Sequence, residues 1–111
     1  MRRGLEGASL VLGGQRAIAA QCGEGWFVEP TIFTDVTPQM RIAQEEVFGP
    51  VLSIIAFDDD EDAVAIANGT IYGLAAGVWT KSINRALTMS QRLEAGTVWV
   101  NTYRATSYMS P

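Results

Sequence analysis

The sequence predicts an α/β fold built on a parallel sheet, and two observations carry this prediction. In the second half of the chain, short apolar, β-rich runs alternate with segments of helical spacing, and the connections between them are short. One of these runs, residues 51–57, is almost continuously apolar, which is typical of a strand buried on both faces. Strand, helix, strand, helix, strand is the order of a parallel sheet with right-handed crossovers. With 111 residues, the chain can form one small domain or a piece of a larger one.

The first quarter of the chain is weakly patterned. We interpret residues 1–8 as an irregular lead-in and residues 9–12 as a short strand that stops at Gly13 and Gly14. Glycine punctuates residues 15–25, which we therefore expect to form a loop.

An aromatic and β-branched run follows at residues 26–33 and predicts a strand. Pro30 lies inside this run and has no N–H to donate, so we expect an edge strand or an interrupted one. Pro38 can open a short helix that continues through residues 39–46.

Acidic residues at 58–62 follow the apolar run and predict a helix start, because carboxylates are stabilised at the positive end of a helix dipole. Asn68 and Gly69 form a natural stop, so we expect a helix over residues 59–68. The D-x-D-x-D pattern of a calcium loop, with its glycine and distal glutamate, is missing. We therefore interpret the acids as a solvated helix start.

The spacing next predicts a strand over residues 75–80, a helix over 82–93 and a strand over 97–101. Gly96 lies where a helix terminator is expected. The apolar residues expected on one side of this helix are Ile83, Ala86, Leu87 and Leu93.

The composition excludes several classes of site. The chain has no histidine, so Ser-His-Asp triads, Cys-His dyads and His-ligated zinc cannot be built within it. Cys22 is the only cysteine, which excludes an intrachain disulfide and a four-cysteine metal site. The net charge of −4 argues against a nucleic-acid partner. No apolar run is long enough to span a bilayer and no signal-peptide pattern is present, so we expect no membrane association and a cytoplasmic location.

Residue patterns for phosphate binding and for nucleophilic catalysis are also missing. Neither G-x-G-x-x-G nor G-x-x-x-x-G-K-[ST] occurs, so no dinucleotide-binding half is encoded here. The neighbours of Cys22 supply neither a positive charge nor a base, which favours an inert loop thiol. Parallel sheets bind ligands beyond the carboxyl ends of their strands, here near Thr80 and Asn101.

The segment from Glu45 to Pro50, with the sequence E-E-V-F-G-P, carries more information than a pair of acids at a helix end. A carboxylate can accept both hydroxyls of a ribose diol. The aromatic ring of Phe48, two residues after Glu46, can pack on a flat heterocycle, although core packing beside the Gly-Pro turn is the alternative.

This segment resembles the E-x-F-G-P signature of the aldehyde dehydrogenase family, and three further segments agree with that family in order and spacing. They resemble its F-x-x-P-T-[IV]-F strand, its A-N-x-x-x-Y-G-L-A-A turn and its A-G-x-x-[WF]-[VI]-N strand. The corresponding residues are 27–33, 67–76 and 95–101. The resemblance implies an incomplete, Rossmann-like portion of the catalytic domain, from its C-terminal part. It covers residues 13–111, after a lead-in and first short strand at 1–12.

The resemblance also implies roles for individual residues. Glu46 corresponds to the family's glutamate that binds the nicotinamide ribose, and Phe48 to its phenylalanine beside the nicotinamide. The loop after the last strand corresponds to part of the aldehyde tunnel, at about Tyr103, Arg104 and Thr106. For Arg104, a plain surface arginine remains the alternative.

The reaction that the resemblance implies is oxidation of an aldehyde to a carboxylic acid through a cysteine thiohemiacetal, with hydride transfer to nicotinamide. The implied cofactor is NAD, with NADP possible, and the implied parent is a homodimer or homotetramer. Acyl-transferring or phosphorylating members of the superfamily are a further possibility, although the motifs are more similar to the hydrolytic branch. Cys22 does not match the family's nucleophile, and no catalytic or metal-binding residue is expected in this chain.

We therefore expect a fragment of an NAD(P)-dependent aldehyde dehydrogenase that has no turnover in isolation. The alternative is a non-catalytic, truncated module that associates with a full-length subunit. The slightly positive mean hydropathy of +0.12 suits either, because both need a surface that another polypeptide covers.

Overall fold

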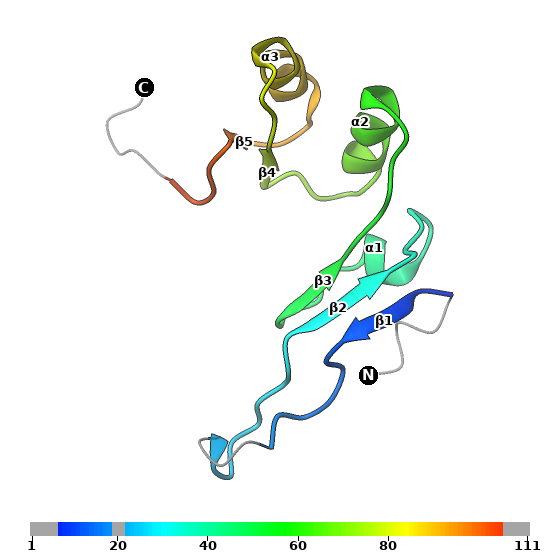
Figure 1. Ribbon diagram of the computed structural model, residues 1–111, viewed down its shortest axis with the longest axis vertical. Coiled ribbons are helices and arrows are strands. Elements are labelled where there is room, and N and C mark those ends of the chain that lie inside the picture. Colours follow the sequence, from blue (N-terminus) through cyan, green and yellow to red (C-terminus); the bar gives the residue numbers. More distant parts are fainter. Residues whose placement is uncertain (1–6, 19–21, 106–111) are drawn as a thin grey trace. The chain divides into compact units, whose positions relative to one another are not determined.

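The computed structural model describes residues 7–18 and 22–105, and the chain divides into two compact units (Figure 1). Unit 1 is Met1–Ala56 and unit 2 is Phe57–Pro111. Each unit contains a pair of parallel strands, as the α/β prediction requires, but the strands belong to two separate sheets. The prediction of parallel pairing is therefore confirmed for the strands near residues 75–80 and 97–101, whereas the strand at 51–53 pairs with a different strand, in the other sheet.

Unit 1 contains a three-stranded sheet in the order β1-β2-β3. Strand β1 (Ser9–Leu12) pairs with β2 (Thr31–Thr34) in antiparallel orientation, and β2 pairs with β3 (Val51–Ser53) in parallel. The strand predicted over 26–33 is interrupted, as expected, because Val28 forms only an isolated bridge before β2 begins. Of the two alternatives, an edge strand or an interrupted one, the structure has the second, since β2 is the central strand of its sheet. Pro30 precedes β2 directly and so needs no ladder hydrogen bond.

Helix α1 (Arg41–Gln44) is one turn long and begins later than the predicted helix over 39–46. The core of unit 1 is small, with Phe33 and Val36 as its buried hydrophobic side chains among the described residues. Thr31 is buried with them and is 1% exposed.

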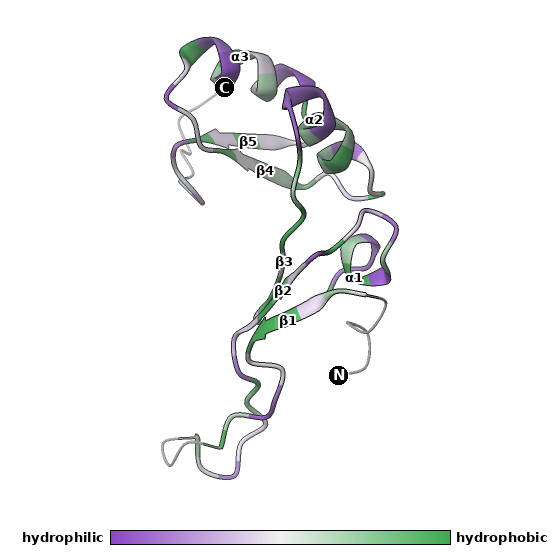
Figure 2. Cartoon of the chain, turned by 45° about the vertical axis from the view of Figure 1, so that its right-hand side comes forward, coloured by the Kyte–Doolittle hydropathy of each residue, from purple (hydrophilic) through white to green (hydrophobic). Residues whose placement is uncertain are grey.

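Strand β3 is shorter and less covered than the sequence predicts. It ends at Ser53, although the hydrophobic segment continues beyond it (Figure 2). Leu52 is 55% exposed and Ile54 is also exposed, so the prediction of a strand buried on both faces is wrong for the described structure. The physical reason is that β3 is an edge strand that pairs with β2 alone.

Unit 2 is a strand-helix-strand unit with one further helix before it. Strands β4 (Ala75–Val78) and β5 (Thr97–Val100) are parallel, and α3 (Ile83–Arg92) connects them. Helix α2 (Asp60–Asn68) precedes β4. Both helices match the predicted ranges to within a residue or so, because their first turns carry capping side chains that can be read from the sequence.

The buried stripe of α3 differs from the predicted one. Ala86 and Met89 are buried, whereas Ile83 and Leu87 are exposed. Residues three apart at 86 and 89 share one stripe of the helix, and the pair at 83 and 87 lies on the neighbouring stripe. Val64 from α2 adds to the buried residues of this unit.

The end of α3 is fixed by Asn68 and not by Gly96. The Asn68 side-chain amide donates to the carbonyl of Arg92 at 2.9 Å, and its oxygen accepts from the N–H of Glu94 at 3.0 Å. The N–H of Gly96 donates to the carbonyl of Gly73 at 2.8 Å, just before β5. The interpretation of Gly96 as a helix terminator is therefore wrong, because this glycine forms a hydrogen bond between the residues that precede β5 and those that precede β4.

Candidate functional site

In the segment between α1 and β3, the side chains of the two adjacent glutamates, Glu45 and Glu46, have different surroundings. The guanidinium of Arg41 binds Glu45 through two contacts, Nε to Oε1 at 2.8 Å and Nη2 to Oε2 at 3.1 Å. Glu45 is therefore tied back to α1, whereas the side chain of Glu46 is exposed. This arrangement presents Glu46, the second glutamate, at the surface of unit 1.

Phe48 is 94% exposed, so core packing does not explain its place among the described residues. Gly49 follows with φ of +153°, a backbone conformation that residues other than glycine rarely adopt. The N–H of Val51 donates to the carbonyl of Gly49 at 2.8 Å, which makes this turn tight. The turn therefore brings an aromatic ring to the surface two residues from a carboxylate.

This exposed segment is anchored to the buried part of the sheet at Pro50. The carbonyl of Pro50 accepts from the N–H of Thr31 at 2.8 Å, directly before the parallel register of β2 with β3 begins. A carboxylate and an aromatic ring are thus carried by a loop whose far end is fixed on the central strand. A loop fixed in this way can recognise a ligand with little loss of its own freedom.

The second group of candidate residues follows β5 in unit 2, where Asn101 binds the exit of β4. Its N–H donates to the carbonyl of Val78 at 2.8 Å, and its side chain pairs with the N–H and the carbonyl of Thr80, each at 2.9 Å. The carboxyl ends of the two strands, which the sequence singled out as the ligand edge, are therefore held together by one side chain.

Tyr103 and Arg104 lie in the loop that starts at Asn101. Tyr103 is exposed, and its ring meets that of Trp99 edge-on with centroids 5.5 Å apart. The indole N–H of Trp99 donates to the carbonyl of Ala105 at 2.7 Å, so one tryptophan holds both ends of the Tyr103 to Ala105 segment. Arg104 is exposed with φ of +59°, and the third residue of this expectation, Thr106, lies outside the described residues.

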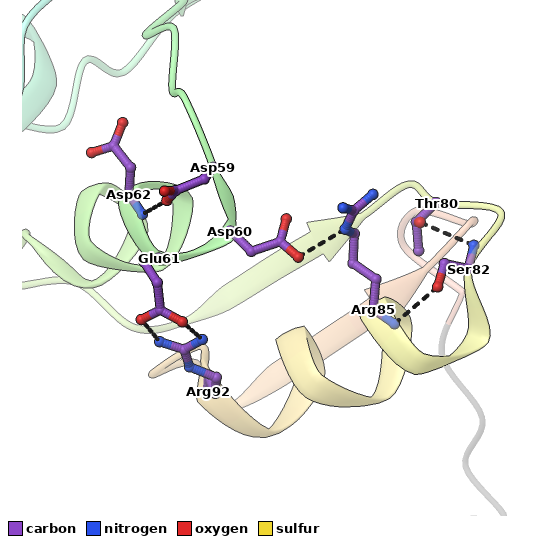
Figure 3. Close-up of polar contacts among 8 residues, drawn as sticks. All are labelled: Asp59, Asp60, Glu61, Asp62, Thr80, Ser82, Arg85 and Arg92. Atoms are coloured by element: carbon purple, nitrogen blue, oxygen red, sulfur yellow. Dashed lines mark hydrogen bonds and ion pairs between the residues drawn. The ribbon is translucent and has the colours of Figure 1, made fainter.

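The acidic run before α2 serves to cap the helix. The Asp59 carboxylate accepts from the N–H of Asp62 at 2.9 Å, and the Asp62 carboxylate accepts from the N–H of Asp58 at 3.1 Å. Ser82 caps α3 in the same way through the N–H of Arg85 (Figure 3). These contacts support the interpretation of the run as a helix start.

Two ion pairs join α2 to α3 (Figure 3). Asp60 accepts from Nε of Arg85 at 2.9 Å, and Glu61 binds both terminal nitrogens of Arg92 at 2.6 and 2.5 Å. The hydrogen bonds from Arg92 lower the pKa of the Glu61 carboxyl, and the charge of the guanidinium adds to this effect. The same pairing raises the pKa of Arg92.

Unit 2 has an open groove of about 810 Å³ between α2, α3 and β4. Its walls include Asp59, Trp79, Thr80 and Met89. Of the described residues in the loop after β5, neither Tyr103 nor Arg104 lines this groove.

Cys22 is half-buried at the start of a turn whose closing hydrogen bond runs from the N–H of Gly25 to the carbonyl of Cys22 at 3.2 Å. Within residues 7–18 and 22–105, no three side chains of His, Cys, Asp or Glu gather closely enough to hold a metal ion. In the same part of the chain, no helix has the length and apolar character needed to cross a bilayer.

Comparison with known proteins decides the family. The model of the aldehyde dehydrogenase family matches residues 2–111, which is nearly the whole chain. The chain belongs to the aldehyde dehydrogenase family. An aldehyde dehydrogenase of Emericella nidulans is 51% identical over 105 residues, which are 95% of this chain and 20% of that protein. One from Enchytraeus buchholzi is 53% identical over 106 residues, 96% of this chain and 20% of that protein.

A solved aldehyde dehydrogenase of Mycobacterium tuberculosis, in complex with NAD+, superimposes with a TM-score of 0.89 at 48% identity. The match covers 98% of this chain and 22% of that structure. This aldehyde dehydrogenase chain thus spans about a fifth of the length of the relatives it matches. The fold of an incomplete, Rossmann-like portion is confirmed by this similarity.

Three polar residues of the family motifs have structural roles that the sequence interpretation missed. They are Thr31 in the P-T pair, Asn68 in the A-N pair and Asn101 in the V-N pair. Each binds backbone groups of a segment 17 to 26 residues away in the chain. In the sequence, Asn68 and Asn101 stand at the ends of predicted elements, whereas Thr31 lies inside the predicted strand and gives no such signal.

Proposed function

We propose that this chain is the C-terminal part of the catalytic domain of an NAD-dependent aldehyde dehydrogenase that oxidises an aldehyde to a carboxylic acid. The observation that carries the proposal is the surface presentation of Glu46 and Phe48 on an anchored loop. The family supplies the reaction, and the NAD+ in the solved relative supplies the cofactor class. NADP remains the alternative nucleotide.

The donor set of the loop fits the nicotinamide half of such a cofactor. The carboxylate of Glu46 has two oxygens and can accept from the two neighbouring hydroxyls of a ribose. The exposed ring of Phe48 offers a flat apolar surface for a nicotinamide ring. When bound, the cofactor accepts a hydride from the substrate, and these two residues orient its ribose and its ring for that transfer.

The role of the loop after β5 in this proposal is to form part of the aldehyde tunnel. Tyr103 presents an aromatic ring there and Arg104 a cation, on a segment that Trp99 holds at both ends. The nucleophile and the base of the reaction are supplied by other parts of the enzyme. We therefore expect the 111-residue chain alone to form no NADH from aldehyde and NAD+.

The Glu46 role is tested in the full-length enzyme by comparing Glu46→Gln with Glu45→Gln. Loss of one charged acceptor toward two hydroxyls should weaken NAD+ binding or slow hydride transfer by about tenfold, because charged hydrogen bonds contribute about 1.5–3 kcal/mol. Glu45→Gln is the matched control, since Arg41 holds that side chain against α1. Kinetics for Glu46→Gln equal to those of the wild type, measured by NADH formation at varied NAD+, would show that the assignment is wrong.

The second candidate, a non-catalytic module that associates with a full-length subunit, is favoured by the exposed hydrophobic side chains of the described chain. Among them are Ile71 and Leu74 in the turn before β4. Co-purification of the 111-residue chain with a full-length subunit, without gain or loss of turnover, would favour this candidate.

A further inference from the structure

Thr31 is the most deeply buried side chain among the described residues and binds three separate segments of unit 1. Its hydroxyl donates to the carbonyl of Glu29 at 2.8 Å and accepts from the N–H of Gly14 at 2.9 Å. Its N–H donates to the carbonyl of Pro50 at 2.8 Å. One residue therefore connects the exit of β1, the entry of β2 and the loop that carries Phe48.

The chain directly after β1 packs tightly against Pro30 and Thr31. A Cβ atom at Gly13 would lie 2.1 Å from the carbonyl oxygen of Pro30 and 2.9 Å from the Thr31 hydroxyl oxygen. Gly13 also has φ of +72°, which favours glycine. The Thr31 hydroxyl therefore lies in a closely packed junction, where an apolar replacement leaves the N–H of Gly14 without its partner. The hydrogen bond from the main-chain N–H of Thr31 to Pro50 stays possible, so the hydroxyl acts on Pro50 by fixing the backbone at residue 31.

We propose that Thr31 is a positioning residue for cofactor binding, which acts through Pro50 on Glu46 and Phe48. In the parallel register, Thr31 lies opposite Val51, the residue that follows Pro50. A displacement of the Thr31 backbone therefore moves the anchored end of the loop. Because Glu46 and Phe48 lie two to four residues before that anchor, their placement depends on it. This inference rests on the proposed function.

The test measures NAD+ binding to the full-length enzyme by calorimetry in the absence of aldehyde, together with KM for NAD+ and for aldehyde. For Thr31→Val we expect about tenfold weaker NAD+ binding, because the hydrogen bonds of the hydroxyl with Gly14 and Glu29 no longer fix the backbone at residue 31, with KM for aldehyde changed by less than about twofold. Thr31→Ser keeps the hydroxyl and should bind NAD+ within about twofold of the wild type.

Val36→Ala is the matched control, because it truncates another buried side chain of unit 1 that has no hydroxyl to bind Gly14 or Glu29. It should lower the unfolding temperature while leaving NAD+ affinity unchanged, which separates positioning from general stability. If Thr31→Val does not fold, Thr31→Ala provides the same comparison, and the Thr31→Ser result still applies.

Wild-type affinity in a folded Thr31→Val or Thr31→Ala variant would overturn this inference alone. A Thr31→Ser variant that loses affinity as strongly as the valine variant would also overturn it. A wild-type enzyme that does not bind NAD+ would overturn the proposed function and this inference with it, so the two failures are distinguishable.

Discussion

Replacement of Asn101 tests how the loop with Tyr103 and Arg104 is held. Asn101 adopts φ of +54°, a left-handed conformation that asparagine tolerates better than most residues. Its side chain makes two hydrogen bonds with the backbone of Thr80, so it supplies both a backbone conformation and a bridge between β5 and β4.

Two substitutions separate these contributions. Asn101→Gly keeps access to the left-handed conformation and loses the bridge, which should cost about 1 kcal/mol for two exposed hydrogen bonds at the low end of their range. Asn101→Ala loses the bridge and also places a Cβ atom in the left-handed conformation, which adds about 1 kcal/mol. The alanine variant should therefore be destabilised by about 2 kcal/mol, twice as much as the glycine variant.

Amide hydrogen exchange in the full-length protein measures this local opening directly, through peptides that contain Thr80 and Asn101. A loss of about 2 kcal/mol corresponds to roughly 30-fold faster exchange, and a loss of about 1 kcal/mol to roughly fivefold. Asn84→Ala is the control, because Asn84 is exposed in α3, where alanine is a better helix former.

Equal exchange rates in the alanine and glycine variants would refute the conformational part of the reasoning. Wild-type protection of Thr80 in both variants would refute the bridge. If the bridge also positions the candidate tunnel loop, KM for aldehyde should rise in both variants while NAD+ affinity stays the same.

Two further predictions concern stability. Gly13→Ala should lower the free energy of unfolding by about 3–5 kcal/mol, because its Cβ atom meets the carbonyl of Pro30. Gly23→Ala should lower it by only about 1 kcal/mol, because no described atom lies within 4 Å of its Cβ; thermal unfolding of both variants tests this difference. Because Arg92 lowers the pKa of Glu61, the pair stabilises the fold above the ordinary carboxyl range and this contribution is lost as the pH falls through and below roughly 4.3. Glu61→Gln should therefore flatten the acid dependence of the unfolding temperature, and parallel curves for variant and wild type would contradict the pairing.

Local signals predicted unit 2 better than unit 1. Helix α2 follows from an acidic first turn and an Asn-Gly stop, and α3 from apolar residues at helical spacing, all within the elements they define or directly beside them. The place of β2 in the centre of its sheet depends on pairing with β1 and β3, some 20 residues away on either side. Pro30 left an edge strand and an interrupted one open, because the sequence does not show that Pro30 lies just before the first hydrogen bond of the ladder.

Only those residues of the candidate site whose own side-chain chemistry suggests a ligand could be predicted from the sequence. Glu46 and Phe48 could be named from a carboxylate, a ring and a Gly-Pro turn in fixed order. The structure adds an ion pair between Arg41 and Glu45. These residues are one helical turn apart, a spacing that permits the pair but does not by itself predict it. The anchoring of the loop on Thr31 could not be predicted, because it depends on the parallel register of two strands.

The family motifs therefore combine two kinds of residue with different physical demands. Glu46 and Phe48 are exposed and can meet a ligand, whereas Thr31, Asn68 and Asn101 bind backbone groups that no strand or helix satisfies at those points. A backbone group left without a partner costs more than an average hydrogen bond gains, so each of the second kind has few acceptable replacements. Substitutions at Thr31 should consequently disturb the placement of Glu46 and Phe48, and substitutions at Asn101 that of the loop with Tyr103 and Arg104. Conversely, Phe48→Ala should remove a ligand contact while leaving the unfolding temperature nearly unchanged, because its ring is not part of the described core.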